Sequence, residues 1–509
     1  MPEKETVFIV GAGPGDFGLL TLRAKELIEK CDILIYDNLV NPHIVSLAKE
    51  SCERIYAGKS GSSHTMEQDE INSLIAEKAA LGKTVVRLKG GDPFIFGRGG
   101  EEALFLHDKG IRFEIVCGVS SAYAVPAYAG IPVTQRGLAS SVAFITGHED
   151  PSKETSDIRW DRLATGVQTL VFLMGVKNLP FIAEQLIKNG RDKNTPAAVI
   201  QNGTFSSQRT VAGTLENIFD RASKENITPP SIIVVGDVVS LREKIGWFET
   251  RPLFGRTIVV TRAREQASIL VQKLMSLGAG VIELPTIKIM PPADVASIRA
   301  AIKDINSYNW IIFTSVNGVS YFFKYLTQME YDARILRGIK ICAIGPATAD
   351  KLREYFIKPD FVPERFTSAD VVQDLEELNE IKNKSFLLPR ADIAPDELRE
   401  SLLARGAALV DDLAVYRTVE QDIADDAPLV SLMKNHEYDM VTFTSSSTAM
   451  NFKKLLDRLE IPVSEKIKCA AIGPVTAKTL KEIGFNADIV AEEFTIDGLV
   501  KIVIKYFSG

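Results

Sequence analysis

The sequence predicts an α/β protein of several domains, in which short strands alternate with helices. Three observations carry this prediction. The chain has 509 residues, which is more than one hydrophobic core usually organises. Short runs rich in Val and Ile alternate with amphipathic segments of helical length, a pattern typical of α/β sheets. The second half also repeats itself with a period of 128 residues.

Composition and charge exclude several classes of protein. The formal net charge is −7, so neither a nucleic acid nor a membrane is an expected partner. No apolar run reaches the roughly 18 residues of a membrane-spanning helix, and the N-terminus lacks the pattern of a signal peptide. The five cysteines and five histidines are scattered, which argues against a disulfide framework and a metal centre. We therefore expect a cytoplasmic protein without a metal.

In the first half, the predicted strands end in glycines or polar residues. Open α/β sheets place functional side chains at the carboxyl ends of strands, so Asp37 and Lys59 are candidates for catalysis. A helix cap or a turn explains each of them equally well. Leu19–Lys30 and Glu67–Leu81 are predicted helices. The predicted strands are Thr6–Val10, Ile33–Tyr36, a strand ending near Tyr56, Thr84–Val86, Thr169–Met174, Ala197–Ile200 and Ser231–Val235.

The segment 11–16, GAGPGD, resembles a dinucleotide-binding loop but departs from it in two places. Asp16 stands where that motif needs glycine or alanine, and Pro14 removes a phosphate-binding N–H. This loop is therefore predicted to cradle a ligand without a pyrophosphate.

A second glycine-rich segment, 87–101 (RLKGGDPFIFGRGGE), follows a predicted strand. Gly90 and Gly91 allow the backbone to approach a ligand closely. Three cations and the apolar run Phe94–Phe96 accompany the glycines, which is unusual for a loop that only faces solvent. The alternative is a glycine-rich surface turn, but the combination favours a binding site.

Several motifs in order resemble the uroporphyrinogen-III C-methyltransferases of the tetrapyrrole methylase family, from about Val7 to Trp247. They are GAGPGD, Tyr36-Asp37, RLKGGDPFIFGRGG, AGIPVTQRG, ITGH, FLMG and VVGDVV. The resemblance implies two α/β subdomains with S-adenosylmethionine in the cleft between them, S-adenosylhomocysteine as a product, and a homodimer formed through this half. The cofactor positions that it implies are Pro14, Gly90, Gly91, Asp92, Ile95, Ser120, Ser121, Met174 and Gly203.

In the family, the residues at the positions of Asp37 and Lys59 accept and donate protons. A pyrrole carbon attacks the sulfonium methyl group, so catalysis is chiefly alignment of the reactants, followed by proton removal by a carboxylate. The substrate carries carboxylates that basic side chains can pair with. The candidates are Arg87, Lys89, Arg98 and Arg136, although each can also be a solvated surface cation.

Two positions depart from the family pattern. Cys117 precedes Gly118 where the family usually has proline, and Gln135 stands where the family usually has histidine. The second change removes a titratable group beside the tetrapyrrole, which puts the recognition of the substrate in question. A methyltransferase for another tetrapyrrole is therefore an alternative.

A connector, residues 247–254, separates the halves and is predicted to be packed. Beyond it, 343–349 (AIGPATA) recurs as 471–477 (AIGPVTA), and FTS at 313–315 recurs at 443–445, two residues out of step with that period. A period this long indicates duplicated domains. Hydroxyls and free N–H groups at such helix starts bind anions or simply cap the helix. The candidates for substrate binding are Thr314, Ser315, Thr348, Ser445, Ser446 and Thr476.

The second half resembles uroporphyrinogen-III synthase from about Gly255 to Gly509, through VTRAREQ, both GPxTA segments, FTSSS and AVYRT. The resemblance implies two lobes of duplicated parallel α/β units, lobe 1 being about 255–286 with 418–509 and lobe 2 about 288–416. It also implies that this half, 255–509, closes hydroxymethylbilane with inversion of the last ring. Tyr416 is the candidate acid for the leaving hydroxyl, or else a hinge residue packed between the lobes.

Together these features predict a bifunctional enzyme that makes uroporphyrinogen III and methylates it twice to precorrin-2. The methyltransferase domain is expected to span residues 1–246. The alternative is a methyltransferase whose second half is a non-catalytic lobe that binds tetrapyrrole. The product leaves both sirohaem and cobalamin open as destinations.

Overall fold

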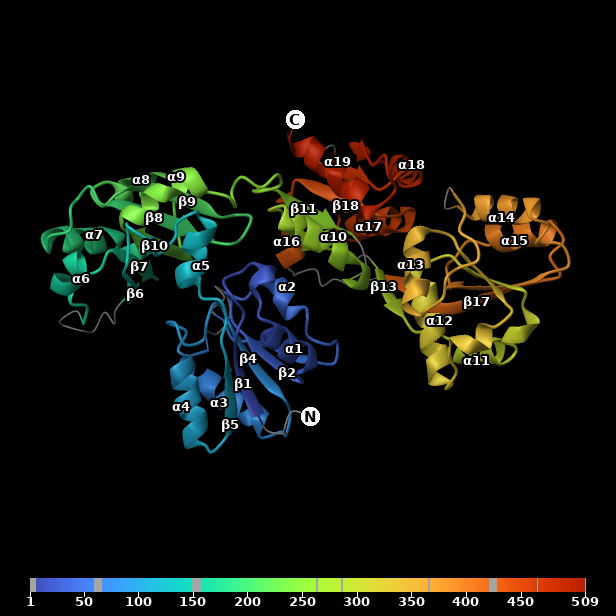
Figure 1. Ribbon diagram of the computed structural model, residues 1–509, viewed down its shortest axis with the longest axis horizontal. Coiled ribbons are helices and arrows are strands. Elements are labelled where there is room, and N and C mark those ends of the chain that lie inside the picture. Colours follow the sequence, from blue (N-terminus) through green and yellow to red (C-terminus); the bar gives the residue numbers. More distant parts are fainter. Residues whose placement is uncertain are drawn as a thin grey trace. The chain divides into compact units, whose positions relative to one another are not determined.

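The computed structural model describes residues 6–58, 66–148, 157–261, 264–284, 287–364, 367–420, 428–464 and 466–508. The predicted α/β class is confirmed, with four five-stranded sheets among these residues (Figure 1). The chain divides into two compact units. Unit 1 comprises Met1–Ile258, Gln272–Val281 and Val503–Gly509, and unit 2 comprises Val259–Val271 and Ile282–Ile502.

The first sheet of unit 1 is parallel and has the order β3-β2-β4-β1-β5. Helices cover both faces, because side chains of α1 and α2 share a core with one face of the sheet and those of α3 and α4 share a core with the other. The elements are β1 (Thr6–Gly11), α1 (Leu22–Lys30), β2 (Ile33–Tyr36), α2 (Pro42–Val45), β3 (Glu53–Tyr56), α3 (Gln68–Ala79), β4 (Val85–Lys89), α4 (Gly99–Asp108) and β5 (Arg112–Val116).

The first predicted helix starts later than expected. Its N-cap is Thr21, whose Oγ1 accepts a hydrogen bond of 3.2 Å from the Ala24 N–H. The preceding residues Phe17–Leu19 form a 3₁₀ turn instead.

The second sheet of unit 1 has the order β6-β7-β10-β8-β9, and only β6 and β7 run parallel. Its helices include α5, which packs against β7 and β10 (Figure 1). The elements are α5 (Ser121–Tyr128), β6 (Val142–Thr146), α6 (Trp160–Gly166), β7 (Thr169–Leu173), α7 (Leu179–Lys188), β8 (Pro196–Gln201), β9 (Arg209–Thr214), α8 (Ile218–Lys224), β10 (Ser231–Val235) and α9 (Arg242–Ile245).

The prediction that the connector 247–254 is packed is confirmed. Phe248 and Leu253 are buried, and the Trp247 indole donates a hydrogen bond of 3.0 Å to the Ala127 carbonyl. The guanidinium group of Arg251 lies 4.7 Å from the centre of the Trp247 ring, a cation–π distance.

The third sheet has the order β12-β11-β18-β19-β20. In the fourth, β13-β17-β16-β14-β15, only the edge strand β13 is antiparallel to its neighbour. The elements are β11 (Thr257–Val260), α10 (Arg264–Ser276), β12 (Gly280–Glu283), β13 (Ile287–Met290), α11 (Val295–Lys303), β14 (Trp310–Phe313), α12 (Val316–Gln328), β15 (Lys340–Ala343), α13 (Pro346–Glu354), α14 (Ser368–Glu377), β16 (Ser385–Ala391), α15 (Glu397–Ala404), β17 (Leu409–Glu420), α16 (Pro428–Lys434), β18 (Met440–Phe443), α17 (Ser446–Arg458), β19 (Cys469–Ala471), α18 (Pro474–Glu482), β20 (Ile489–Val490) and α19 (Ile496–Ser508).

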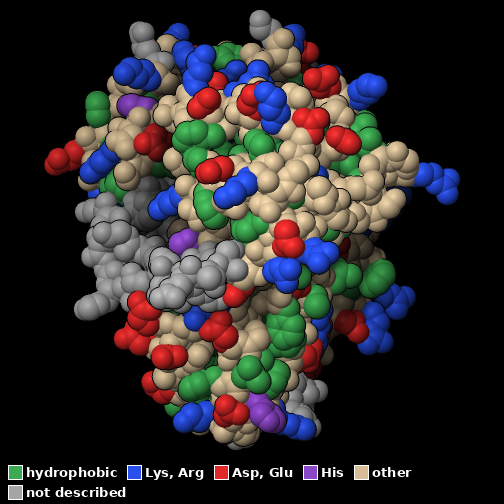
Figure 2. All heavy atoms as spheres, turned by 90° about the vertical axis from the view of Figure 1, so that its left-hand side faces the viewer, with side chains coloured by type: hydrophobic (Ala, Val, Ile, Leu, Met, Phe, Trp, Pro, Cys, Tyr) green, Lys and Arg blue, Asp and Glu red, His purple; other side chains and the backbone are tan. Residues whose placement is uncertain are grey.

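The surface of the N-terminal half carries both signs of charge. On the face shown in Figure 2, basic and acidic side chains are interspersed, with small hydrophobic groups between them. Among the described residues, none of the helices combines the length and the apolar character that crossing a membrane requires.

Candidate functional site

At the carboxyl ends of β1, β4 and β5, three chain segments are in direct backbone contact, because the residues at the contact are glycines. The Gly91 N–H donates a hydrogen bond of 2.7 Å to the Gly13 carbonyl, and the Gly13 N–H returns one of 3.1 Å. A Cβ on Gly11 would lie 2.6 Å from the Gly118 Cα, and a Cβ on Gly118 would collide with the Gly91 carbonyl oxygen. Glycine is therefore required here for steric reasons, and the three segments pack backbone against backbone.

The carboxylate of Asp92 ties two of these loops together. Asp92 is buried, its Oδ1 accepts a hydrogen bond of 2.8 Å from the Phe94 N–H, and its Oδ2 accepts one of 3.0 Å from the Gly118 N–H. Ser121 is next to this point, because its N–H nitrogen lies 3.7 Å from where a Cβ of Gly91 would be. Three of the predicted cofactor residues, Gly91, Asp92 and Ser121, thus lie together.

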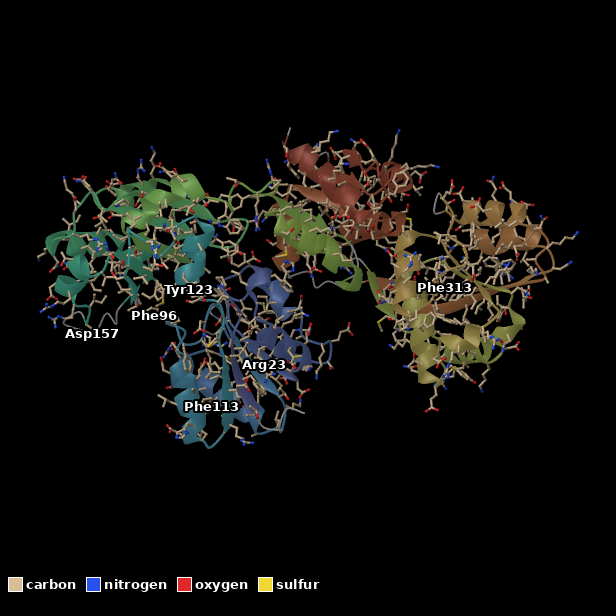
Figure 3. The ribbon with its side chains drawn as sticks, in the orientation of Figure 1. Arg23, Phe96, Phe113, Tyr123, Asp157 and Phe313 are labelled. Atoms are coloured by element: carbon tan, nitrogen blue, oxygen red, sulfur yellow. The ribbon has the colours of Figure 1, made fainter. Side chains whose placement is uncertain are left out.

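Large apolar side chains are exposed on α5 and in the segments that follow β2, β4 and β7. Phe94 is 55% exposed and Met174, which follows β7, is 54% exposed. Phe96 and Met174 also have positive φ values of 53° and 57°, a strained backbone for such residues that often marks functional sites. The exposed side chains in these segments are Leu39, Phe94, Ile95, Phe96, Tyr123 and Met174. Figure 3 shows Phe96 on the loop before α4 and Tyr123 on α5.

The loop after β1 also contacts the loop after β8, so the two sheets of unit 1 are joined here. The Asp16 N–H donates a hydrogen bond of 3.1 Å to Thr204 Oγ1, and the Tyr128 hydroxyl donates one of 2.8 Å to Asp16 Oδ2. The predicted residue Pro14 is half-buried in the first loop. Gly203, in the second loop, has no room for a Cβ because Val125 of α5 packs against it. Ser120 is the buried N-cap of α5.

The predicted cations fall into two groups. Arg87 and Lys89 are buried, and both pair with the carboxylate of Glu102, at 3.1 Å and 2.7 Å. Burial and the neighbouring Arg87 lower the pKa of the Lys89 ammonium group. Arg98 is exposed and pairs with Glu101 at 2.6 Å. Arg136 is exposed.

Asp37, the candidate proton acceptor, follows β2 and is held from two sides. Its Oδ1 accepts a hydrogen bond of 3.1 Å from the Leu39 N–H, and its Oδ2 lies 3.7 Å from a guanidinium nitrogen of Arg87. The other candidate, Lys59, lies outside the described residues.

In the fourth sheet, Tyr416 of β17 lies next to the first of the FTS segments. Tyr416 is 7% exposed, and its hydroxyl lies 3.2 Å from the Oγ of Ser315. Burial raises the pKa of the Tyr416 phenol. Ser315 is also the N-cap of α12, directly after Thr314. Thr348 is buried in the first turn of α13.

The second FTS segment has the same local structure in the third sheet. Ser445 is the N-cap of α17, the Oγ of Ser446 accepts a hydrogen bond of 2.8 Å from Thr479 of α18, and Thr476 is buried in the first turn of α18. The predicted hydroxyl residues therefore lie at equivalent helix N-termini in the two sheets. Ser315 and Ser445 are the N-caps of α12 and α17.

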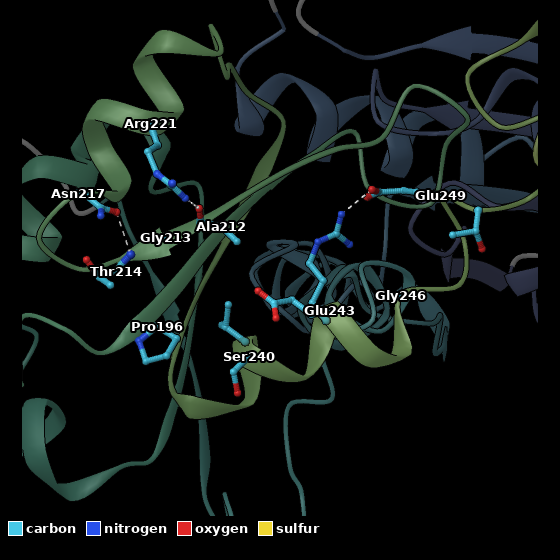
Figure 4. Close-up of a pocket in the computed structure, with 13 residues that line it drawn as sticks. Pro196, Ala212, Gly213, Thr214, Asn217, Arg221, Ser240, Glu243, Gly246 and Glu249 are labelled. Carbon is cyan, nitrogen blue, oxygen red and sulfur yellow. Dashed lines mark hydrogen bonds and ion pairs between the residues drawn. The ribbon is translucent and has the colours of Figure 1, made fainter.

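A groove of about 680 Å³ lies elsewhere, on the second sheet between β9 and α9 (Figure 4). Three of its charged side chains, Arg221, Arg242 and Glu249, are engaged with the protein itself. Arg242 pairs with Glu249 at 2.5 Å, and Arg221 donates to the Ala212 carbonyl. None of the catalytic or binding residues predicted from the sequence lines this groove.

Some residues of the site were not predicted from the sequence, chiefly Glu102 and Tyr128. Glu102 is 13 residues from Lys89 along the chain, so only the packing of α4 on β4 brings them together. The sequence contains one signal for such a residue. Two cations stand at alternate positions of a strand, and buried cations require an anion nearby. Among the described residues, no group of His, Cys, Asp and Glu has the arrangement of a metal site.

Comparisons with known proteins match each half to a family. The model of the tetrapyrrole (corrin/porphyrin) methylases matches residues 6–218, and that of uroporphyrinogen-III synthase HemD matches residues 268–501. Over 508 residues the chain is 38% identical to the porphyrin biosynthesis protein HemD of Ruminiclostridium josui, covering 100% of this chain and 99% of that protein.

Two relatives match the N-terminal half alone. A uroporphyrinogen-III C-methyltransferase of Bacillus subtilis is 52% identical over 244 residues, which cover 48% of this chain and 95% of that protein. An S-adenosyl-L-methionine-dependent uroporphyrinogen III methyltransferase of Methanosarcina barkeri is 52% identical over 240 residues, covering 47% of this chain and 94% of that protein. The two resemblances expected from the motifs are confirmed.

Proposed function

The chain belongs to the tetrapyrrole methylase family in its N-terminal half and to the uroporphyrinogen-III synthase family in its C-terminal half, and from this premise we propose how its residues carry out two reactions. It is a bifunctional enzyme of tetrapyrrole biosynthesis. The C-terminal half closes hydroxymethylbilane to uroporphyrinogen III, and the N-terminal half methylates that product twice to precorrin-2. The observation that carries this function is the presence of both families in one chain, where one reaction makes the substrate of the next.

The methyltransferase half uses S-adenosylmethionine, which supplies a sulfonium methyl group when bound. Gly11 and Gly118 pack directly against neighbouring backbone, whereas the atom nearest to a Cβ on Gly91 would be the Ser121 nitrogen at 3.7 Å, which leaves the backbone there open to a ligand. The exposed side chains of Ile95 and Met174 offer apolar contacts. These features fit a flat, partly apolar cofactor. The residues that would hold it are Pro14, Gly90, Gly91, Asp92, Ile95, Ser120, Ser121, Met174 and Gly203.

The chain's own side chains align the tetrapyrrole and remove its proton. Asp37 accepts the proton that leaves the methylated carbon, and Lys59 donates one. The exposed cations Arg98 and Arg136 pair with substrate carboxylates. Arg87 and Lys89 are not assigned to substrate carboxylates, because both side chains are buried and form ion pairs with Glu102.

In the synthase half, Tyr416 donates a proton to the leaving hydroxyl of hydroxymethylbilane. A raised pKa keeps the phenol protonated, and Ser315 lies within hydrogen-bond distance to orient it. The hydroxyls and N–H groups at four helix starts receive the carboxylates of the substrate. They belong to Thr314, Ser315, Thr348, Ser445, Ser446 and Thr476.

The domain boundaries in this proposal are 1–246 for the methyltransferase, 247–254 for the connector and 255–509 for the synthase, whose lobes are about 255–286 with 418–509, and about 288–416. The enzyme forms a homodimer through its methyltransferase half and works in the cytoplasm. The cysteines support a reducing compartment, since all five are free thiols.

The test supplies anaerobic hydroxymethylbilane with and without S-adenosylmethionine and identifies the macrocycle by mass and isomer. Type III macrocycle alone, converted to a dimethylated product when the cofactor is added, supports both activities. Type I isomer in both tubes would mean that the ring closed without help. The second half would then be a lobe that binds tetrapyrrole.

A further inference from the structure

Glu102, in the first turn of α4, is a completely buried carboxylate beside the methyltransferase site. Its side chain is 0% exposed. A single oxygen, Oε1, accepts hydrogen bonds from Lys89 Nζ at 2.7 Å, from Arg87 Nε at 3.1 Å and from Gln68 Nε2 at 3.3 Å. The other oxygen, Oε2, is buried without a hydrogen-bond donor among the described residues.

Burying three charged groups costs free energy, which is unfavourable if their role is only structural. Buried ion pairs lose their hydration, and apolar side chains of similar volume often give equal or greater stability. Here two buried cations share one buried carboxylate, so the group Arg87, Lys89 and Glu102 carries an excess of positive charge. Asp37 supplies the second carboxylate, with its Oδ2 3.7 Å from Arg87.

The strand geometry explains why these groups meet. Arg87 and Lys89 occupy alternate positions of β4, so both side chains lie on the face covered by α3 and α4. β4 lies directly beside β2 in the sheet, and Asp37 follows β2. Arg87 is therefore placed between Glu102 behind it and Asp37 at the end of the neighbouring strand.

We propose that Glu102 is a positioning residue for Asp37 and acts through Arg87. The proposal rests on the proposed function, in which Asp37 accepts the substrate proton. Glu102 holds the Nε edge of Arg87, so that the guanidinium group approaches Asp37 only to 3.7 Å, longer than a hydrogen bond. The Leu39 N–H fixes the other carboxylate oxygen. Asp37 is thus oriented from two sides and keeps an oxygen for the proton.

Without the charge of Glu102, Arg87 is free to form a close, two-pronged pair with Asp37. That pair would occupy both carboxylate oxygens and turn them away from the substrate. The isosteric substitution Glu102→Gln makes this change with almost no change in volume. The expected result is a fall in kcat for methyl transfer of about tenfold or more, with the Kd for S-adenosylmethionine within about twofold of the wild-type value.

The experiment uses the full chain and reads three quantities from each preparation. They are kcat for methylation of supplied uroporphyrinogen III, the Kd of S-adenosylmethionine by calorimetry, and the synthase rate as an internal measure of active protein. Glu249→Gln is the matched control, because Glu249 is also an ion-paired carboxylate of unit 1, bound to Arg242. We expect it to leave kcat unchanged.

An unchanged kcat in Glu102→Gln would overturn the proposal, as would a parallel loss of kcat and cofactor affinity, which indicates a structural role. If Glu102→Gln does not fold, Glu102→Gln with Lys89→Gln removes one charge of each sign and decides the question by the same criteria. A wild-type chain that produces no methylated tetrapyrrole would instead refute the proposed function, which separates the two failures.

Discussion

The hydroxyl of Tyr128 donates a hydrogen bond of 2.8 Å to Asp16, and this bond links elements that pack on different sheets of unit 1. Tyr128 ends α5, which packs against β7 and β10, whereas Asp16 follows β1. The same aspartate donates its N–H to Thr204 after β8. These hydrogen bonds therefore help to fix the distance between the two sheets at the proposed cofactor site. The chain connection between the sheets does the rest.

Removal of this hydrogen bond should loosen the cofactor site. Tyr128→Phe keeps the ring in its aromatic cluster with Trp247 and Phe248 but leaves a carboxylate oxygen of Asp16 without its donor. We expect a loss of stability of about 1.5–3 kcal/mol and a higher Kd for S-adenosylmethionine. Thermal melting and calorimetry measure the two effects. Tyr331→Phe, at an exposed tyrosine of the second half, should change neither.

The carboxylate of Asp92 is predicted to shape the loops after β4 and β5. Asp92→Ala deprives the Phe94 and Gly118 N–H groups of their acceptor, and a lost hydrogen bond to a charged group costs about 1.5–3 kcal/mol. We expect the Kd of S-adenosylmethionine to rise at least about tenfold, as measured by calorimetry. Asp108→Ala, an exposed aspartate at the end of α4, should bind the cofactor like the wild type. Equal affinities in the two variants would contradict the role of Asp92.

The close contact of the glycines predicts opposite outcomes for two alanine substitutions. Gly118→Ala places a Cβ against the Gly91 carbonyl oxygen, so the loops must separate, and we expect lower stability and no measurable cofactor binding. Gly100→Ala, in the first turn of α4, meets no atom within 4 Å and should stabilise that helix by up to about 1 kcal/mol. Thermal melting with and without S-adenosylmethionine distinguishes the two.

Tyr416 is predicted to act in ring closure and not in methylation. Tyr416→Phe preserves the packing against Tyr321, whose ring centre is 5.6 Å away, and removes only the hydroxyl beside Ser315. If the phenol is the acid, formation of the type III isomer should fall by about 10²-fold or more, while methylation of supplied uroporphyrinogen III stays unchanged. A normal rate of ring closure would leave Tyr416 with the packing role of a hinge residue.

Buried thiols predict a loss of stability at alkaline pH. Burial raises the pKa of the Cys342 thiol from 9.0 to about 12. Above pH 9 the unfolded chain releases this proton while the folded chain keeps it, so the free energy of unfolding falls as the pH rises toward 12. The melting temperature of Cys342→Ala should therefore decrease less over this range than that of the wild type. Identical pH profiles would show that the thiol does not contribute.

The fold was largely predictable from the sequence, because local patterns decide it. Runs such as Thr6–Val10 and Ser231–Val235 have the apolar, β-branched character of buried strands, and they are strands. β9 was not predicted, because Arg209–Thr214 is only partly buried and contains a glycine. The mixed direction of the second sheet was not predicted either, because strand pairing is a long-range property.

The backbone of the candidate site could be predicted from the sequence, but the partners of its charged side chains could not. Glycines and strand ends are visible in the sequence, and Gly91, Asp92 and Ser121 do lie together. Whether a cation faces a ligand or a buried carboxylate depends on helix packing. Arg87 and Arg98 belong to the same loop segment, yet one is buried against Glu102 and the other is exposed.

The contact between Gly118 and Asp92 has a practical use in spectroscopy. Of the five cysteines, four are buried and Cys117 is exposed, and it directly precedes Gly118. A thiol-reactive fluorophore should therefore label the native chain selectively at Cys117 without any engineering. Because Gly118 is hydrogen-bonded to Asp92, the dye would report on the loops at the proposed cofactor site, so that binding can be followed in real time by fluorescence.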